Sequence, residues 1–437
     1  MRRELAIALR APVTWVVAAL SALLVGHGFI LSVDLYSASS RSAFASALQA
    51  REMDPLAGVV RPTLGGLDLA ISLFVPLVAA RILSADKERR TFGALCLLEG
   101  SSDRVVVEKL CAGVAASALS FIAPVVAFVV FHAVGAHIDA IETSSALAGE
   151  GLHLVLIAAV SLAAASWTRT LAQAATLGIM ISLSSWAIDA AEDFAALAWL
   201  GGASSWSIER QLAPFQRGIL SVGSLVWLIA ATAAATVLAL TGARFDGSRI
   251  RRSAIGGATI VVTGLILVAA ANSHRAYDWT EQRRASLPPA AVRGLRAIRA
   301  PLSMDVFLDR DDSRRRQLES DVIGKLYLAR PDLTVRMPLD ARESVTEVQR
   351  EPDYGRILIH VGPSTKETRS TSRREIVGLI FDAAGKPLPD WTLPSYEGFP
   401  FVTEGARRMV LVLLAYVVVP VAFLTTAVVL TRRRSIR

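Results

Sequence analysis

The sequence predicts a mainly α-helical, polytopic membrane protein with about eight transmembrane helices and a small extracytoplasmic α/β domain between the last two. Eight apolar stretches lie between Val13 and Leu430. Most have the roughly 20 residues needed to cross a hydrocarbon core about 30 Å thick. A long hydrophilic stretch, residues 273–405, separates the last two of them. The charges between the stretches differ in sign, and this difference predicts the orientation of the chain.

Basic residues gather on one side of the predicted membrane. If the chain starts in the cytoplasm and crosses eight times, the short inward segments hold 18 Lys/Arg against 7 Asp/Glu. The short outward loops hold 5 Lys/Arg against 11 Asp/Glu. Because basic loops resist translocation, both termini are expected in the cytoplasm and residues 273–406 on the other side of the membrane. The formal net charge of +8 then mostly reflects topology, and no nucleic-acid partner is expected.

The first span is predicted at residues 13–33, after an amphipathic stretch, residues 1–10, that is expected to lie on the inner membrane surface. The span is too long for a signal-peptide core and lacks a small-residue cleavage site, so no cleavable signal peptide is expected. Gly26-His27-Gly28 predicts a break within it, and an outer loop is predicted at 34–63. The other spans are predicted at 64–83, 109–134, 151–166, 171–190, 219–240, 254–271 and 409–430. Residues 193–217 are too short and interrupted to span, and predict a half-inserted or interfacial element.

The hydrophilic stretch shows both structural periods. Alternating apolar residues predict strands at 302–308, 333–337 and 356–361, and helical spacing predicts helices at 311–328 and 372–382. Residues 343–353 are predicted to form an exposed loop. Alternating strands and helices imply an α/β layer. The two cysteines, Cys96 and Cys111, fall on or near the cytoplasmic side, where a disulfide is not expected.

The chain is not expected to be an enzyme. The segment Gly362-Pro363-Ser364-Thr365-Lys366 has the residues of a phosphate-binding loop in the wrong order, so ATP would have to bind a second polypeptide. The six histidines form no His-x-x-x-His pair, and no metal site is expected. Serine-rich patches at 182–185 and 204–207 lack the Gly-x-Ser-x-Gly pattern of a nucleophile, which favours a role in helix packing. Asp68 and Arg81 are interpreted as interfacial anchors, with a polar gate as the alternative.

The charged stretch after the second predicted span is the most specific local feature. It begins with Asp86-Lys87-Glu88-Arg89-Arg90 and continues through Leu98. Phe92, Leu95 and Leu98 recur at helical spacing, so a short helix would present an apolar ridge beside charged residues. The alternative is a helix that lies on lipid headgroups.

This stretch resembles the segment after span two of ABC-2-type exporter permeases. The resemblance rests on the charged cluster, a threonine, a leucine-rich run, a turn, and a valine-rich approach to Lys109-Leu110, with matching positions at Glu88, Thr91, Leu95, Ser101, Val105, Val106 and Lys109. The sequence departs from the family pattern at Arg90, Glu99 and Glu108. In that family the segment is a coupling helix that fits a groove on a cytoplasmic ATPase. The resemblance therefore implies a coupling role for Glu88, Arg89, Thr91, Phe92, Leu95, Leu98 and Lys109.

The hydrophilic stretch resembles the gliding-motility-type auxiliary component of ABC exporters. The matching residues are Asn272, Tyr277-Asp278-Trp279-Thr280, Ser286-Leu287-Pro288, Leu295 and Val306-Phe307-Leu308. That component is a span, an extracytoplasmic α/β domain and a final span. The resemblance implies a fusion of four parts: a six-helix permease domain (1–250), a seventh helix (251–272), a periplasmic domain (273–406), and an eighth helix with a basic cytoplasmic tail (407–437).

Both resemblances imply the permease subunit of an ATP-driven exporter in a bacterial inner membrane, with residues 273–406 in the periplasm. This chain would bind no cofactor, because ATP would bind a separate cytoplasmic ABC ATPase. The other expected partners are a second permease copy or a homologous permease, the lipid bilayer, and a periplasmic partner of the outer domain. The alternative function is a mechanical transmitter, which would use ATP-driven motion to control an envelope partner without moving cargo.

Overall fold

The computed structural model describes residues 2–44, 46–51, 53–190, 206–244, 248–271, 273, 275–309, 312–341, 353–389 and 396–435. The chain divides into two units. The helical unit comprises Met1–Asn272 and Glu397–Arg437, and the α/β unit comprises Ser273–Tyr396. The α/β unit therefore ends before the boundary predicted at residue 406.

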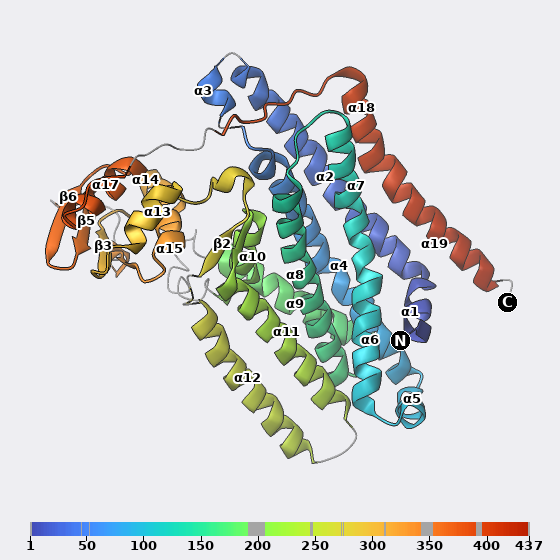
Figure 1. The fold of residues 1–437 in the computed structure, drawn as a ribbon. Helices are drawn as coiled ribbons and strands as arrows, with labels where there is room; N and C mark the ends of the chain where they lie inside the picture. The colour runs from blue at the N-terminus through green and yellow to red at the C-terminus, as the bar shows by residue number, and fades with distance from the viewer. Residues whose placement is uncertain are drawn as a thin grey trace. The chain divides into compact units, whose positions relative to one another are not determined.

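Eight helices among the described residues are long and apolar enough to cross a membrane, in the predicted order (Figure 1). They are α2 (Pro12–Ala43), η1 with α4 (Leu56–Val60, Arg61–Glu88), α6 with η2 and α7 (Ser102–Ser117, Ala118–Phe121, Ile122–Ala133), α8 (Ala140–Trp167), α9 (Leu171–Ala190), α11 (Val222–Ala243), α12 (Arg249–Ala271), and α18 with η9 and α19 (Gly405–Leu413, Leu414–Val418, Val419–Ser435). Shorter elements of this unit are α1 (Arg2–Leu9), α3 (Ala47–Ala50), α5 (Phe92–Glu99), α10 (Ile208–Gln216) and β1 (Ile219–Ser221).

Helix α2 is longer than the predicted first span and has no break. The prediction of a break at Gly26-His27-Gly28 is wrong, because α2 is continuous from Pro12 to Ala43. Gly26 instead permits close packing against the last span: a Cβ at this position would lie 2.7 Å from the carbonyl oxygen of Ala415. The rings of Trp15 and Phe423 also pack together, with centroids 6.1 Å apart. The first and last spans are therefore neighbours.

The predicted outer loop at 34–63 is largely helical. Helix α2 extends to Ala43, and α3 and η1 follow. The serines of this extension hold the chain that leads into the last span: Ser40 Oγ accepts a hydrogen bond from the Phe401 N–H, and Ser37 Oγ accepts one from the Thr403 N–H, both at 3.0 Å. These bonds satisfy backbone groups of a segment that has no regular structure of its own.

Arg408 lies on the predicted outer side, against the usual excess of basic residues inside. Its guanidinium forms a bidentate ion pair with Asp34 of α2, at 2.9 and 3.0 Å. This pairing neutralises the charge and adds a further link between the first and last spans.

Residues 193–205 of the predicted half-inserted element lie outside the described residues. The remainder forms α10, which begins after Ser207, whose hydroxyl accepts a hydrogen bond from the Arg210 N–H at 3.1 Å. Ile208, Leu212 and Phe215 are buried and belong to the same apolar cluster as residues of α8. Helix α10 therefore covers part of α8.

The α/β unit contains a four-stranded mixed sheet with the strand order β4 (Thr334–Arg336), β3 (Leu302–Val306), β5 (Ile357–Val361), β6 (Ser364–Thr368). Strands β3 and β4 are parallel, and the other two pairs are antiparallel. The remaining elements are β2 (Ala276–Asp278), η6 (Glu281–Arg283), α13 (Pro289–Arg296), α14 (Ser313–Leu318), η7 (Glu319–Ile323), α15 (Gly324–Ala329), η8 (Pro338–Ala341) and α17 (Arg373–Ala383). Buried residues of β3 and β5 alternate along each strand and share one core with the helices.

This unit confirms the predicted strands at 302–308, 333–337 and 356–361 and the two predicted helices. Most of the predicted loop at 343–353 lies outside the described residues. Helix α13 and strand β6 were not predicted from the sequence. Strand β6 is polar and forms a sheet edge, and it pairs with β5 through a two-residue turn in which Gly362 has φ +57°. The segment Gly362-Pro363-Ser364-Thr365-Lys366, whose residue order excluded a phosphate-binding loop, forms the turn of this hairpin and the start of β6.

Candidate functional site

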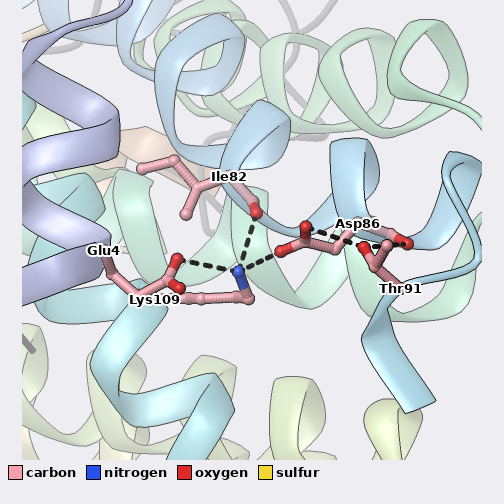
Figure 2. Close-up of polar contacts among 5 residues, drawn as sticks. All are labelled: Glu4, Ile82, Asp86, Thr91 and Lys109. Atoms are coloured by element: carbon pink, nitrogen blue, oxygen red, sulfur yellow. Dashed lines mark hydrogen bonds and ion pairs between the residues drawn. The ribbon is translucent and has the colours of Figure 1, made fainter. Parts of the chain in front are cut away.

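Helix α5 is held between two tight turns at one end of the helical unit. Helix α4 ends at Glu88, and Arg90 then adopts a left-handed backbone with φ +59°. The Thr91 hydroxyl donates a hydrogen bond to the Asp86 carboxylate at 3.1 Å, and its N–H donates to the Asp86 carbonyl at 2.9 Å (Figure 2). At the other end, Gly100 has φ +71°, a conformation that glycine adopts without strain. These contacts fix where α5 leaves α4.

Lys109 of α6 lies at the centre of a buried polar cluster behind α5. The residue is 1% exposed, and its ammonium donates hydrogen bonds to Glu4 Oε2 at 2.9 Å and to the Ile82 carbonyl at 3.2 Å. It also contacts the Asp86 carboxylate, so that the ammonium lies between two acidic groups (Figure 2). A buried ammonium is tolerated when such partners satisfy it. This cluster joins α1, α4 and α6.

The end of α4 also holds the turn between α8 and α9. Lys87 Nζ donates hydrogen bonds to three carbonyl oxygens at the end of α8, those of Ala165 (2.8 Å), Ser166 (2.9 Å) and Thr168 (2.6 Å). Glu88 Oε1 accepts a hydrogen bond from the Leu171 N–H at the start of α9, at 2.8 Å. The two side chains therefore satisfy backbone groups that helix ends leave without intrahelical partners.

The predicted apolar ridge of Phe92, Leu95 and Leu98 does not form one exposed face. Phe92 is 6% exposed and packs in a cluster with residues of α4, α6 and α8. Leu95 is half-buried, whereas Leu98 is 79% exposed and its neighbour Leu97 is 85% exposed. An α-helix turns about 100° per residue, so two steps of three residues place Leu98 about 120° from Phe92. The exposed apolar surface of α5 is therefore Leu97 and Leu98.

Ion pairs form at the C-terminal end of α5 and the start of α6. Arg104 pairs with Glu99 at 3.4 Å and with Glu108 at 3.5 Å. Arg244, which follows α11, forms a bidentate pair with Asp103 at 3.0 and 2.5 Å. These pairs connect the start of α6 to α5 and α11.

A cavity of about 310 Å³ opens between α1, α4 and α5, and its lining includes Arg3, Arg81 and Arg89. Nearby, burial raises the pKa of the Cys96 thiol, and the Lys109 ammonium opposes part of that effect. The cavity therefore places basic side chains beside Thr91 and Leu95.

The structure brings the sequence-predicted residues into one region, with different roles. Thr91 and Lys109 are linked through Asp86, Glu88 caps α9, and Arg89 lines the cavity. Phe92 anchors α5, while Leu98 is exposed. Four contributors are not among the coupling residues predicted from the sequence: Glu4, Asp86, Lys87 and Leu97. The first three act on groups far away in the chain, which local spacing does not reveal.

No protein-family model, curated protein or solved structure matches the chain. The fold and the site define a multi-pass helical membrane protein. Its short helix α5 is held against α4 and α6 on one side and exposes two leucines on the other.

Proposed function

We propose that this chain is the membrane-spanning permease subunit of an ATP-driven, ABC-2-type exporter, and that α5 docks a separate cytoplasmic ATPase. The observation that carries the proposal is the contrast between the two faces of α5. Leu97 and Leu98 are exposed, while Phe92 and the Lys109 cluster fix the opposite side. An apolar pair on a rigidly held helix suits insertion into a groove of a partner.

The contacts of α5 and its neighbours would transmit a movement of α5 to the other helices. If ATP binding closes two ATPase subunits, displacement of α5 acts directly on α4 and α6, since tight turns join it to both. Lys109 passes that displacement to α1, and Lys87 and Glu88 pass it to α8 and α9. A second permease copy or a homologous permease would complete the export path.

The proposed orientation places both termini and α5 in the cytoplasm and the α/β unit in the periplasm of a bacterial cell. The charge distribution of the short loops supports it. The pairing of Arg408 with Asp34 is compatible with it, because it neutralises an arginine that this orientation places on the outer side.

A photocrosslinking residue in place of Leu97 tests the docking proposal in native membranes. We expect a crosslink to an ATP-binding protein, identified by mass spectrometry. The matched control is the same residue in place of Leu388, which is 39% exposed in the α/β unit, and there the ATPase crosslink should be missing. If position 97 crosslinks lipid alone, or gives the same products as position 388, docking through α5 is refuted.

The second candidate is a mechanical transmitter that moves no cargo. The hydrogen bonds from Phe401 and Thr403 to α2 favour it, because movement of α2 would pull on the chain that leaves the α/β unit. ATPase activity of the purified complex in proteoliposomes separates the two functions. Stimulation by a small-molecule or lipid substrate favours export, and stimulation only by a periplasmic protein fraction favours the transmitter.

A further inference from the structure

A second polar cluster lies inside the helical unit, away from α5. It consists of Asp68 of α4 and Glu150 and His153 of α8, whose candidate ligand atoms all lie within 4.8 Å of one another. The side chains of Glu150 and His153 are fully buried, and that of Asp68 is 15% exposed. Two carboxyl groups and an imidazole thus meet in the packed interior between two spans.

The helices hold these side chains in place. Glu150 and His153 are three residues apart, so they lie on the same face of α8. Helix α10 covers them: Gln216 Nε2 donates a hydrogen bond to Glu150 Oε1 at 2.8 Å. Gly149 lets α10 approach closely, since a Cβ there would lie 2.7 Å from Cβ of Phe215. The cluster is therefore closed as well as buried.

Three buried side-chain atoms face one another inside the cluster: Asp68 Oδ1, Glu150 Oε2 and His153 Nδ1. His153 Nδ1 lies 2.9 Å from Asp68 Oδ1 and 3.8 Å from Glu150 Oε2. Glu150 Oε2 is buried and has no hydrogen bond among the described residues. Buried polar atoms are nearly always satisfied in folded proteins, so this oxygen points to a ligand that it shares with Asp68 Oδ1 and His153 Nδ1.

We propose that Asp68, Glu150 and His153 bind a divalent first-row transition metal ion, with Zn²⁺ the best fit. Bonds of 2.0–2.2 Å to nitrogen and oxygen place the ligands of a tetrahedral ion about 3.3–3.5 Å apart, and the two measured separations bracket that value. Imidazole with carboxylates suits such metals, whereas Ca²⁺ and Mg²⁺ prefer oxygen ligands alone. The two positive charges of the ion balance the two carboxylates.

The three protein ligands come from two packed spans, and α10 covers them. A water molecule would supply the fourth ligand of a tetrahedral ion. Bound metal would tie α4 to α8 at a point distant along α4 from the Lys87 contacts. This site does not depend on the exporter proposal, because its ligands are separate from α5.

Metal titration of the full chain in nanodiscs tests the site. After treatment with a chelator, we expect the protein to take up one Zn²⁺ per chain, measured by inductively coupled plasma mass spectrometry. Co²⁺ should bind in its place and give the intense visible absorption of a four-coordinate ion. His153→Gln and Asp68→Asn should each weaken binding by about tenfold or more, because each removes a ligand.

The matched control is His132→Gln, which changes a histidine of α7 whose Nδ1 lies 3.2 Å from the Ala136 carbonyl. It should bind Zn²⁺ as the unchanged protein does. The proposal is overturned if the unchanged protein binds no Zn²⁺, or if His153→Gln and Asp68→Asn bind it as tightly as His132→Gln. If His153→Gln does not fold, the Co²⁺ spectrum of the unchanged protein and the Asp68→Asn titration still decide.

Discussion

The ammonium of Lys109 is buried between the carboxylates of Glu4 and Asp86. Lys109→Met would leave both carboxylates without this counter-charge, and breaking a buried pair in this way costs about 3–5 kcal/mol. Because Glu4 and Asp86 retain 13% and 23% exposure, the lower end is expected. Unfolding of the protein in detergent by added denaturant measures the loss.

The control for this loss is Arg41→Met in the same unit. Arg41 pairs with Glu404 at 3.1 Å, but both side chains are well exposed, at 62% and 70%. Exposed pairs contribute about 1 kcal/mol at most. Equal effects of Lys109→Met and Arg41→Met would show that the Lys109 cluster does not brace the helices.

Lys325 of α15 makes the stability of the α/β unit depend on pH. Burial lowers its pKa from the ordinary 10.5 to about 8, and its Nζ donates a hydrogen bond to the Arg284 carbonyl at 2.9 Å. Between these two values the unfolded chain holds more protons than the folded unit, so stability should rise as pH increases from about 8 towards 10.5. Hydrogen exchange of β3 in the full chain, corrected for intrinsic pH dependence, follows this rise.

Lys325→Met removes the titrating group while keeping much of the side-chain volume. We expect this variant to lose the rise in protection above pH 8 and to be better protected than the unchanged protein below it. An unchanged pH dependence in the variant would assign the effect to other groups.

At the scale of elements, the contact between α2 and η9 depends on a glycine. Gly26→Ala would place a methyl group 2.7 Å from the Ala415 carbonyl oxygen, and a backbone atom cannot move away as a flexible side chain can. We expect a loss of about 1–3 kcal/mol, as for other overpacked sites, measured as a lower thermal midpoint in detergent. The matched control is Gly65→Ala on α4, where nothing lies within 4 Å; this change should be neutral or slightly stabilising. Equal midpoints for the two variants would contradict the packing.

The sequence predicted elements better than contacts. Length and hydropathy were sufficient to locate eight spans, because both are local properties. The Gly26-His27-Gly28 prediction failed because glycine both weakens an isolated helix and permits close packing, and only the partner helix decides between them. Strand β6 was missed because a polar edge strand lacks the alternation that marks a buried one.

At the candidate sites, too, the sequence predicted local elements but not the contacts between them. The spacing of Phe92, Leu95 and Leu98 correctly indicated a helix. Residues three positions apart do not point in the same direction from the helix axis, however, so Phe92 faces inward and Leu98 faces outward. The Asp68 cluster contains a Glu-x-x-His pair that could have been recognised as metal-ligand spacing. Its third member comes from α4, and no local pattern links the two helices.

At the scale of the molecule, the spans that precede and follow the α/β unit do not form a side-by-side pair. Helix α12 packs on α11 and α19 packs on α2, and α12 and α19 lie on opposite sides of the bundle (Figure 1). Both spans belong to the same helical unit as the other six. The resemblance to a fused auxiliary component therefore concerns the order of segments along the chain, and all eight spans pack as one bundle.

Both the docking of α5 and the role of the α/β unit require that the two lie on opposite sides of the membrane. Cysteine labelling tests this directly, starting from a chain with Cys96→Ser and Cys111→Ser. Leu388→Cys should react with a membrane-impermeant maleimide in intact spheroplasts, and Leu97→Cys should react only after the membrane is permeabilised. Labelling of Leu97→Cys in intact spheroplasts, with Leu388→Cys protected, would contradict the proposed orientation and the function built on it.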